Sequence, residues 1–213
     1  MKIESARFLT SASDLAACPQ SRLPEIAFIG RSNVGKSSLV NMLTKQKELA
    51  KVSKMPGKTK LINFFSMDGW WNLVDLPGYG FAKVAKGEQQ RFNVSVADYL
   101  MGRTNLTQVF VLVDSRFEPM ELDLEFLAWM QDCPAPHALV FTKTDEVSAE
   151  KWRRNMDVYE ETLRALELRV PAMIPCSSKD RAGRGELLKH IESALPKKPR
   201  KGAKTGVSIG WMK

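Results

Sequence analysis

Residues 30–37 read Gly-Arg-Ser-Asn-Val-Gly-Lys-Ser, the spacing of a phosphate-binding loop. An apolar run at 26–29 precedes them and a mostly apolar run follows, so the loop joins a predicted strand to a predicted helix. Its glycines let the backbone approach phosphate oxygens, and N–H groups at the helix start supply positive potential. Lys36 can reach the β- and γ-phosphates, and the Ser37 hydroxyl can bind Mg²⁺. The pattern predicts a nucleotide site; the alternative is an ordinary turn that contains glycine.

Two polar segments follow later apolar runs and are suited to reading a guanine base. They are residues 142–145 (Thr-Lys-Thr-Asp) and 177–179 (Ser-Ser-Lys). The Asp145 carboxylate can accept hydrogen bonds from N1–H and the 2-amino group of guanine, which adenine does not present. Lys143 can cover the purine face, and N–H groups around Ser178 can meet the guanine O6. Each segment alone would be read as the polar end of a strand, but their order after a phosphate loop favours guanine.

Residues 75–78 (Asp-Leu-Pro-Gly) are suited to sensing a γ-phosphate. Asp75 can hold Mg²⁺ through water, and the Gly78 N–H can meet the γ-phosphate. Upstream, the Thr59 hydroxyl can complete the Mg²⁺ octahedron. Thr44 is the alternative ligand, although we expect it to end the preceding helix. The predicted catalytic residues are Lys36, Thr59 and Gly78, and the predicted metal ligands are Ser37, Thr59 and Asp75, the last through water.

These motifs resemble those of the translation-factor-related P-loop GTPases, and within them the EngB family (also called YihA or YsxC) of bacterial ribosome-assembly GTPases. The resemblance spans about residues 23–195. Most G proteins carry Asn where Thr142 stands; the family commonly has Thr, which leaves open how tightly the base loop is tied to the phosphate loop. The residues expected to contact the nucleotide are Gly30, Arg31, Ser32, Asn33, Val34, Gly35, Lys36, Ser37, Ser38, Gly57, Lys58, Thr59, Lys60, Leu61, Asp75, Leu76, Pro77, Gly78, Thr142, Lys143, Thr144, Asp145, Ser177, Ser178 and Lys179.

The resemblance implies a GTP- and GDP-binding, slowly GTP-hydrolysing switch that uses Mg²⁺ and acts in assembly of the large ribosomal subunit. Its partners would be ribosomal RNA or a precursor of that subunit, and the family is linked to normal cell division and septation. Tyr79 stands where Ras-like proteins carry the Gln that orients the attacking water, so we expect low intrinsic turnover. In related GTPases an Asn at the position of Asn33 helps to hold K⁺; the alternative is an Asn that braces the loop.

The predicted fold is α/β, the three-layer P-loop GTPase fold with helices on both faces of a mostly parallel six-stranded sheet. Asp68 and Gly69 signal a hairpin, so residues 61–65 should form one antiparallel edge strand. The predicted parallel strands, which share continuous apolar composition, are 26–29, 71–74, 109–113, 138–141 and 172–174. The predicted helices are 36–44, about 90–101, about 122–130, 149–168 and 185–195. In the fourth, Trp152, Met156, Tyr159, Leu163 and Leu166 form one apolar face, expected to pack on the sheet rather than in a coiled coil.

Composition indicates one core, since the chain has 213 residues and is 44% hydrophobic. We predict an N-terminal extension at 1–22, a G domain at 23–195 and a basic, flexible tail at 196–213. The three cysteines are isolated, which argues against metal or disulfide sites and favours a reducing, cytoplasmic location. His137 and His190 have no evident nucleophile partner and are expected in ordinary surface or packing roles. No apolar stretch has the length of a membrane span, and we expect a monomer.

Charge indicates a polyanionic partner. Of the net charge of +8, the tail contributes +6, because it holds six Lys or Arg and no acidic residue. The tail is expected to contact ribosomal RNA, where Trp211 could stack on an unpaired base or dock on the domain. The alternative for the tail is a surface that promotes solubility. Two other function classes remain open: a P-loop ATPase or small-molecule kinase, and an RNA-binding module whose nucleotide site is structural.

Overall fold

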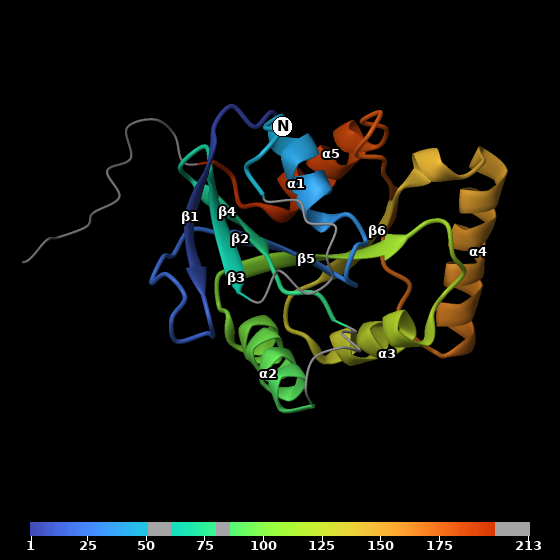
Figure 1. The fold of residues 1–213 in the computed structure, drawn as a ribbon, viewed down its shortest axis with the longest axis horizontal. Helices are drawn as coiled ribbons and strands as arrows, with labels where there is room; N and C mark the ends of the chain where they lie inside the picture. Colours follow the sequence, from blue (N-terminus) through green and yellow to red (C-terminus); the bar gives the residue numbers. More distant parts are fainter. Residues whose placement is uncertain (51–60, 80–85, 199–213) are drawn as a thin grey trace, which may run out of the picture.

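The computed structural model describes residues 1–50, 61–79 and 86–198, the side chains of 86–93 excepted. The strands form one seven-stranded sheet in the order β1-β3-β4-β2-β5-β6-β7 (Figure 1). They are β1 Ala6–Ala12, β2 Glu25–Gly30, β3 Ile62–Met67, β4 Trp71–Asp75, β5 Leu106–Asp114, β6 His137–Thr142 and β7 Met173–Pro175. The pairs of β2 with β4 and β5, of β5 with β6 and of β6 with β7 are parallel. The predicted three-layer α/β class and the five apolar parallel strands are confirmed.

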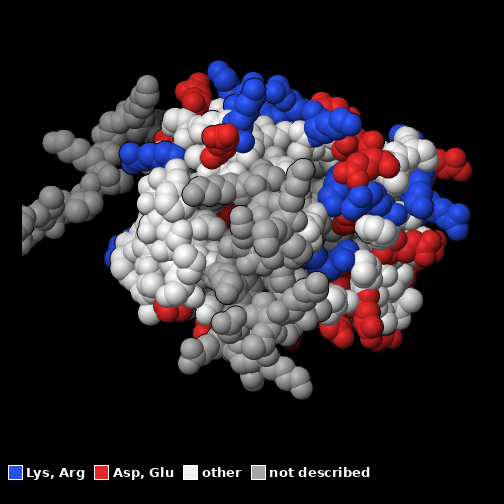
Figure 2. All heavy atoms as spheres, viewed as in Figure 1, with Lys and Arg blue, Asp and Glu red and all other residues white. Residues whose placement is uncertain are grey.

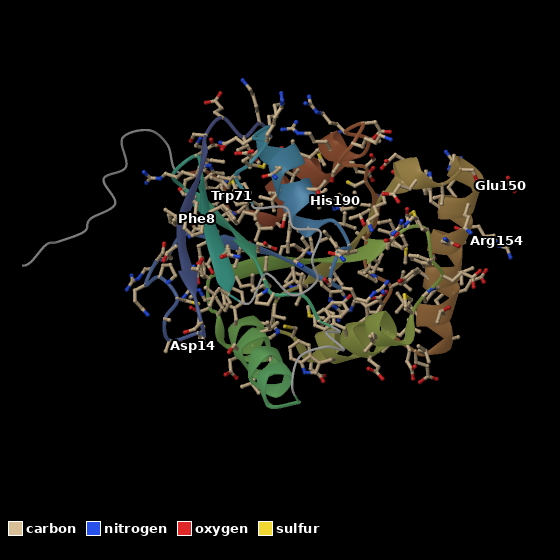
Figure 3. All side chains as sticks on the ribbon, viewed as in Figure 1. Phe8, Asp14, Trp71, Glu150, Arg154 and His190 are labelled. Atoms are coloured by element: carbon tan, nitrogen blue, oxygen red, sulfur yellow. The ribbon has the colours of Figure 1, made fainter. Side chains whose placement is uncertain are left out.

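The predicted strand number and the predicted edge are wrong. A seventh strand, β1, pairs antiparallel with β3, so β3 lies inside the sheet and β1 forms the edge. Sequence reasoning missed β1 because Phe8 and Leu9 are adjacent and both exposed, so the strand has no apolar alternation; a register shift lies between Phe8 and Thr10. Figure 3 shows Phe8 on this edge strand, and its ring meets that of Phe65 edge-on at 5.7 Å.

The predicted hairpin between β3 and β4 is confirmed. Asp68 and Gly69 both have positive φ, 52° and 68°, as a tight type I′ connection requires. The Asp68 carboxylate also accepts hydrogen bonds from the N–H groups of Glu4 and Ser5 at 2.9 and 2.7 Å. The turn therefore holds the segment that leads into β1. The proposed division of the chain after residue 22 stays a prediction, although β1 joins the common sheet.

Helices cover both faces of the sheet (Figure 1). They are α1 Lys36–Thr44, α2 Lys86–Gly102, α3 Glu121–Trp129, α4 Ala149–Ala165 and α5 Arg184–Ala194, with 3₁₀ turns η1 Met130–Asp132 and η2 Thr144–Glu146. Leu43 of α1 and Ile191 of α5 are in the core on one face. Tyr99 of α2, Leu127 of α3 and Leu163 of α4 are in the core on the other.

The predicted fourth helix is shorter than expected. It ends at Ala165, and Leu166, placed by its spacing on the apolar face, is 51% exposed. Tyr159 and Leu163 are buried as predicted, whereas Trp152 and Met156 are only partly buried. Packing on the sheet thus uses mainly the middle and end of the helix.

A buried ion pair anchors α2 to the amino end of β2. Glu25 is fully buried and accepts hydrogen bonds from the Tyr99 hydroxyl at 2.7 Å and from two nitrogens of Arg103 at 2.8 and 2.7 Å. Arg103 also donates to the carbonyl of Pro19 at 2.7 Å. These contacts lie at the opposite end of β2 from the phosphate loop.

In the described part of the chain, no helix is long and apolar enough to cross a membrane.

Candidate nucleotide-binding site

The predicted motifs meet at the carboxyl edge of the parallel strands, the usual ligand edge of an open α/β sheet. Gly30 ends β2 and Asp75 ends β4, and Phe28 of β2 pairs in register with Asp75. Asp114 ends β5 and pairs in register with Thr142, which ends β6. Segments far apart in sequence therefore lie around one edge.

The phosphate loop needs both of its predicted glycines. A Cβ at Gly30 would lie 2.5 Å from the carbonyl oxygen of Leu112. Gly35 begins α1 with φ +106°, which side-chain-bearing residues rarely adopt. The first turn of α1 has no acidic residue, and no described side chain caps it, so its first N–H groups remain available to an anion. Asn33 is exposed with φ 60°, and its contact with K⁺ stays a prediction.

Lys36 and Asp75 form a buried pair of opposite charge. Their exposed fractions are 9% and 2%. Burial raises the pKa of Asp75 to about 6, although the charge of Lys36 opposes the shift. Burial likewise lowers the pKa of Lys36, which Asp75 partly offsets. Among the described residues, Oδ1 of Asp75 has no hydrogen-bond partner. A buried carboxylate with an unpaired oxygen, beside Lys36 of the phosphate loop, fits the oxygen donor set that Mg²⁺ prefers.

Gly78 lies directly on the phosphate loop. A Cβ at this residue would be 2.7 Å from the carbonyl oxygen of Gly30 and 3.3 Å from the nitrogen of Ser32. Leu76 is buried, and its N–H donates to the carbonyl of Phe28 at 2.9 Å. The Asp-Leu-Pro-Gly segment is thus held against β2 and the phosphate loop, while the predicted contact of Gly78 with a γ-phosphate stays a prediction. The predicted contacts Gly57, Lys58, Thr59 and Lys60 lie outside the described residues, and Leu61 is 44% exposed just before β3.

The base loop is tied to the phosphate loop through Thr142. Its hydroxyl lies 2.6 Å from the carbonyl oxygen of Val34 and 3.1 Å from that of Val113, and its side chain is buried. The two segments predicted to read the guanine base also contact each other, because the Ser177 hydroxyl donates to Asp145 at 2.7 Å. Ser177 also accepts from the N–H of Lys179 at 3.2 Å. The question that the sequence left open is answered: Thr142 joins the two loops directly.

Comparison with known proteins agrees with this geometry. A family model described as 50S ribosome-binding GTPase matches residues 25–143. The probable GTP-binding protein EngB of Porphyromonas gingivalis is 46% identical over 193 residues, which cover 91% of this chain and 96% of the relative. The chain belongs to the EngB family. The EngB protein of Flavobacterium johnsoniae is also 46% identical, over 90% of this chain and 92% of its own length.

Solved structures support the same fold. A probable GTP-binding protein EngB aligns with a TM-score of 0.65 and 23% identity, over 80% of this chain and 97% of that one. Era in complex with MgGDPNP and nucleotides 1506–1542 of 16S ribosomal RNA aligns with a TM-score of 0.63 and 20% identity, over 83% of this chain and 58% of that one. These two alignments support the fold, while the family assignment rests on the sequence relatives and on the GTPase family model.

Asp114 lies among the predicted nucleotide-binding residues, next to Thr142 and Lys143, although no role was predicted for it from the sequence. It accepts a 2.7 Å hydrogen bond from Lys143 Nζ, two from the Arg116 guanidinium at 2.9 and 2.8 Å, and one from the Arg116 backbone N–H at 3.2 Å. Burial alone would raise the pKa of Asp114, but the hydrogen bonds from Arg116 and Lys143 and the charge of Lys143 hold that pKa below its ordinary value. Lys143 has φ 62°, so Asp114 fixes a lysine whose backbone is already unusual. The sequence could have indicated Asp114 by its position, because Asp114, like Asp75, is a carboxylate at the end of an apolar strand.

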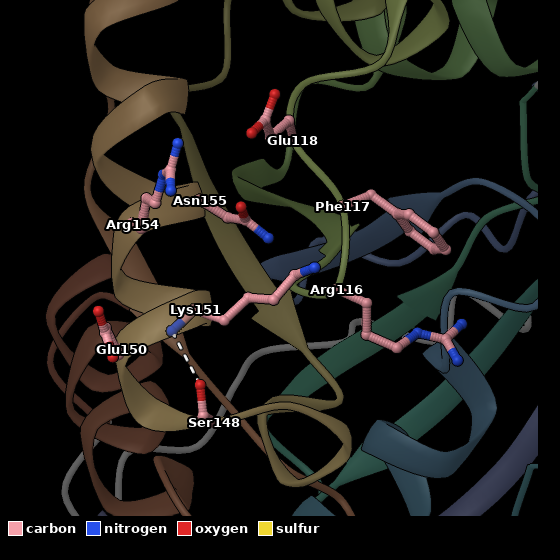
Figure 4. A pocket seen from close by; sticks show the side chains of 8 residues that line it. All are labelled: Arg116, Phe117, Glu118, Ser148, Glu150, Lys151, Arg154 and Asn155. Atoms are coloured by element: carbon pink, nitrogen blue, oxygen red, sulfur yellow. Dashed lines mark hydrogen bonds between the residues drawn. The ribbon is translucent and has the colours of Figure 1, made fainter.

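A separate cleft of about 560 Å³ lies between the loop after β5 and the start of α4 (Figure 4). Its lining mixes both charges and consists of Arg116, Phe117, Glu118, Ser148, Glu150, Lys151, Arg154 and Asn155. Lys151 extends toward the loop after β5, while its backbone N–H bonds the Ser148 hydroxyl at 3.2 Å. None of these residues was predicted to contact the nucleotide. The cleft is therefore separate from the predicted nucleotide-binding residues.

Proposed function

We propose that this protein binds GTP and GDP at the carboxyl edge of the sheet and hydrolyses GTP slowly, as a switch. The observation that carries the proposal is the 2.6 Å hydrogen bond from Thr142 to the carbonyl of Val34. It joins the loop that can read guanine to the loop that can bind phosphates, so one ligand can engage both. The proposed nucleotide contacts are those predicted from the sequence.

In this proposal each group has a defined role. Lys36 and the phosphate-loop N–H groups stabilise charge on the phosphates, and the Gly78 N–H contacts the γ-phosphate. Ser37 and Thr59, with Asp75 through water, would hold Mg²⁺, which supplies further charge stabilisation when bound. Water attacks the γ-phosphate in line. The Tyr79 hydroxyl donates to Asp123 at 3.0 Å, so this phenol does not replace a water-orienting Gln, and turnover is slow.

The test is a titration with GTP, GDP and ATP. We expect GTP to bind at least about 10²-fold more tightly than ATP, because adenine would leave the Asp145 carboxylate without its donors. Lys36→Met should abolish tight binding of both guanine nucleotides. Lys189→Met, at an exposed lysine of α5, is the matched control and should bind as the wild type does. Equal affinity for GTP and ATP would instead favour a P-loop ATPase.

We propose further that the protein acts in the cytoplasm, as a monomer, on precursors of the large ribosomal subunit, and contacts ribosomal RNA. The description of the matching family and the net charge of +8 support this. Figure 2 shows Lys and Arg gathered along the top of the molecule, where α1 and α5 lie in Figure 1. Exposed cations near these helices include Lys45, Lys47 and Lys189. We propose the link to cell division and septation as a consequence of defective subunit assembly.

Binding to ribosomal particles across a salt series tests the RNA contact. Deleting residues 199–213 removes four Lys or Arg and keeps the described part of the chain. The slope of the logarithm of the binding constant against the logarithm of the salt concentration should fall in magnitude by at most about 3. Each neutralised phosphate on a single strand contributes about 0.7 to that slope. An unchanged slope would indicate that the tail does not contact RNA and only promotes solubility. The particles should also discriminate GDP from a GTP analogue; binding that ignores the nucleotide and survives Lys36→Met would favour the RNA-binding module.

A comparison of hydrolysis in K⁺ and Na⁺ at equal ionic strength tests the proposed role of Asn33. Faster hydrolysis in K⁺ is expected if the exposed Asn33 helps to hold that ion beside the phosphates. Equal rates would leave Asn33 as a brace of the loop.

A further inference from the structure

The Asp123 carboxylate joins three parts of the molecule that are far apart in sequence. It lies in the first turn of α3 and is fully buried. Its Oδ1 accepts hydrogen bonds from Arg31 Nε at 2.9 Å and from the Tyr79 hydroxyl at 3.0 Å. Its Oδ2 accepts one from the Tyr159 hydroxyl of α4 at 3.0 Å. One carboxylate thus holds the phosphate loop, the residue after Gly78, and helix α4, which packs on the same face of the sheet as α3.

The aromatic ring of Tyr79, like its hydroxyl, contacts α3. It stacks on Phe126 of α3 with ring centroids 4.3 Å apart and an interplanar angle of 17°. Tyr79 directly follows Gly78, whose backbone lies against the carbonyl of Gly30. Because the two residues are adjacent in the chain, a shift of Tyr79 would displace Gly78 from its place against the phosphate loop. The Arg31 contact ties the phosphate loop itself to the same carboxylate.

We propose that Asp123 is a positioning residue that latches Tyr79 to Arg31 and so keeps Gly78 where the γ-phosphate of GTP binds. The inference rests on the proposed GTP site. GTP would contact Gly78 and GDP would not, because only GTP carries the γ-phosphate. A ligand that needs Gly78 in place gains affinity when the protein holds it there in advance, and a ligand that does not need it gains nothing. The latch therefore raises affinity for GTP selectively.

Tyr79→Phe tests the latch, because it removes the bond to Asp123 and retains the ring that stacks on Phe126. The bond joins a hydroxyl to a charged group, so its loss should weaken binding of a non-hydrolysable GTP analogue by up to about tenfold. Binding of GDP should stay within about twofold. A merely structural role would lower both affinities together and leave their ratio unchanged.

Tyr159→Phe is the matched control. It removes the same kind of bond to the other oxygen of the same carboxylate, from a residue of α4 rather than from the residue that follows Gly78. We expect it to lower thermal stability and leave the ratio of the two affinities unchanged. Asp123→Asn, which keeps the side-chain shape but loses the charge, should lower the ratio at least as much as Tyr79→Phe.

The outcomes separate the latch from the function on which it rests. Wild-type protein that binds no guanine nucleotide overturns the proposed function and the latch together. Wild-type protein that binds both nucleotides, with an unchanged ratio in Tyr79→Phe, overturns the latch alone. A shift in Tyr159→Phe equal to that in Tyr79→Phe also overturns it, since a general loosening around Asp123 would then be the cause. If Tyr79→Phe fails to fold, Asp123→Asn decides by the same ratio.

Discussion

Replacing Thr142 with valine removes one hydroxyl and tests whether the base loop and the phosphate loop act as one unit. The side chain is 2% exposed, and the hydroxyl lies 2.6 Å from the carbonyl oxygen of Val34. Valine keeps the shape, so the change deletes the donor and leaves that carbonyl without this bond. A buried polar group that loses its partner costs about 1–3 kcal/mol. For a chain of this size, each kcal/mol lowers Tm by about 2–4 °C, so we expect a fall of roughly 2–12 °C.

The nucleotide affinities should fall together in Thr142→Val. Val34 belongs to the loop around the phosphates that GTP and GDP share, so loosening it weakens both, while the preference for guanine over adenine survives because Asp145 is untouched. Thermal denaturation of the nucleotide-free protein and a parallel titration with GTP, GDP and ATP measure these effects.

Thr44→Val is the control for the loss of a buried threonine hydroxyl. Thr44 is also buried, and its hydroxyl donates to the carbonyl of Val40 at 2.9 Å within α1. That carbonyl already accepts a backbone bond in the helix, so the stability cost should be smaller and the nucleotide affinities should not change. Thr142→Val protein that binds GTP and GDP as tightly as wild type would refute the idea that this bond couples the loops.

Three other changes, the last with a control at an exposed ion pair, give distinct outcomes. Asp145→Asn should shift preference toward xanthine nucleotides, whose 2-oxo group accepts where guanine donates; a competition titration that still favours GTP would contradict this. Asp114→Asn should lower the free energy of unfolding at pH 7. The difference from wild type should begin to shrink as the pH falls below about 4, the pKa of an unfolded Asp, and should vanish only below the lowered folded pKa, because the carboxyl stabilises the fold only while it is ionised. Arg103→Met should cost about 3–5 kcal/mol, since it leaves the buried charge of Glu25 without its cation, and should spare nucleotide affinity. Arg164→Met, at an exposed pair, should cost at most about 0.5 kcal/mol in the same melts.

Much of the fold and of the site could be predicted where local chemistry determines the outcome. The phosphate-loop helix was predicted at the residues that form α1, because glycine at its start and the run after it leave few alternatives. The continuous apolar runs became parallel strands, since only a sheet buried on both faces accepts them. The Asp68-Gly69 turn adopts the positive φ angles that its residue types favour. Helix ends were less predictable: α4 stops before Leu166, where the packing surface ends.

The sequence by itself determined which motifs this chain carries, and from them the residues that we propose to bind phosphate, guanine and Mg²⁺, because motif chemistry depends on residue types at short spacing. Only the tertiary structure decided which of them touch. Strand β1 joins the sheet by pairing with β3, about fifty residues away, and carries no pattern of its own. Asp123 reads as an ordinary helix carboxylate until folding brings Arg31, Tyr79 and Tyr159 to it. Contacts of this kind depend on the crossing of distant elements, and short-range spacing does not encode them.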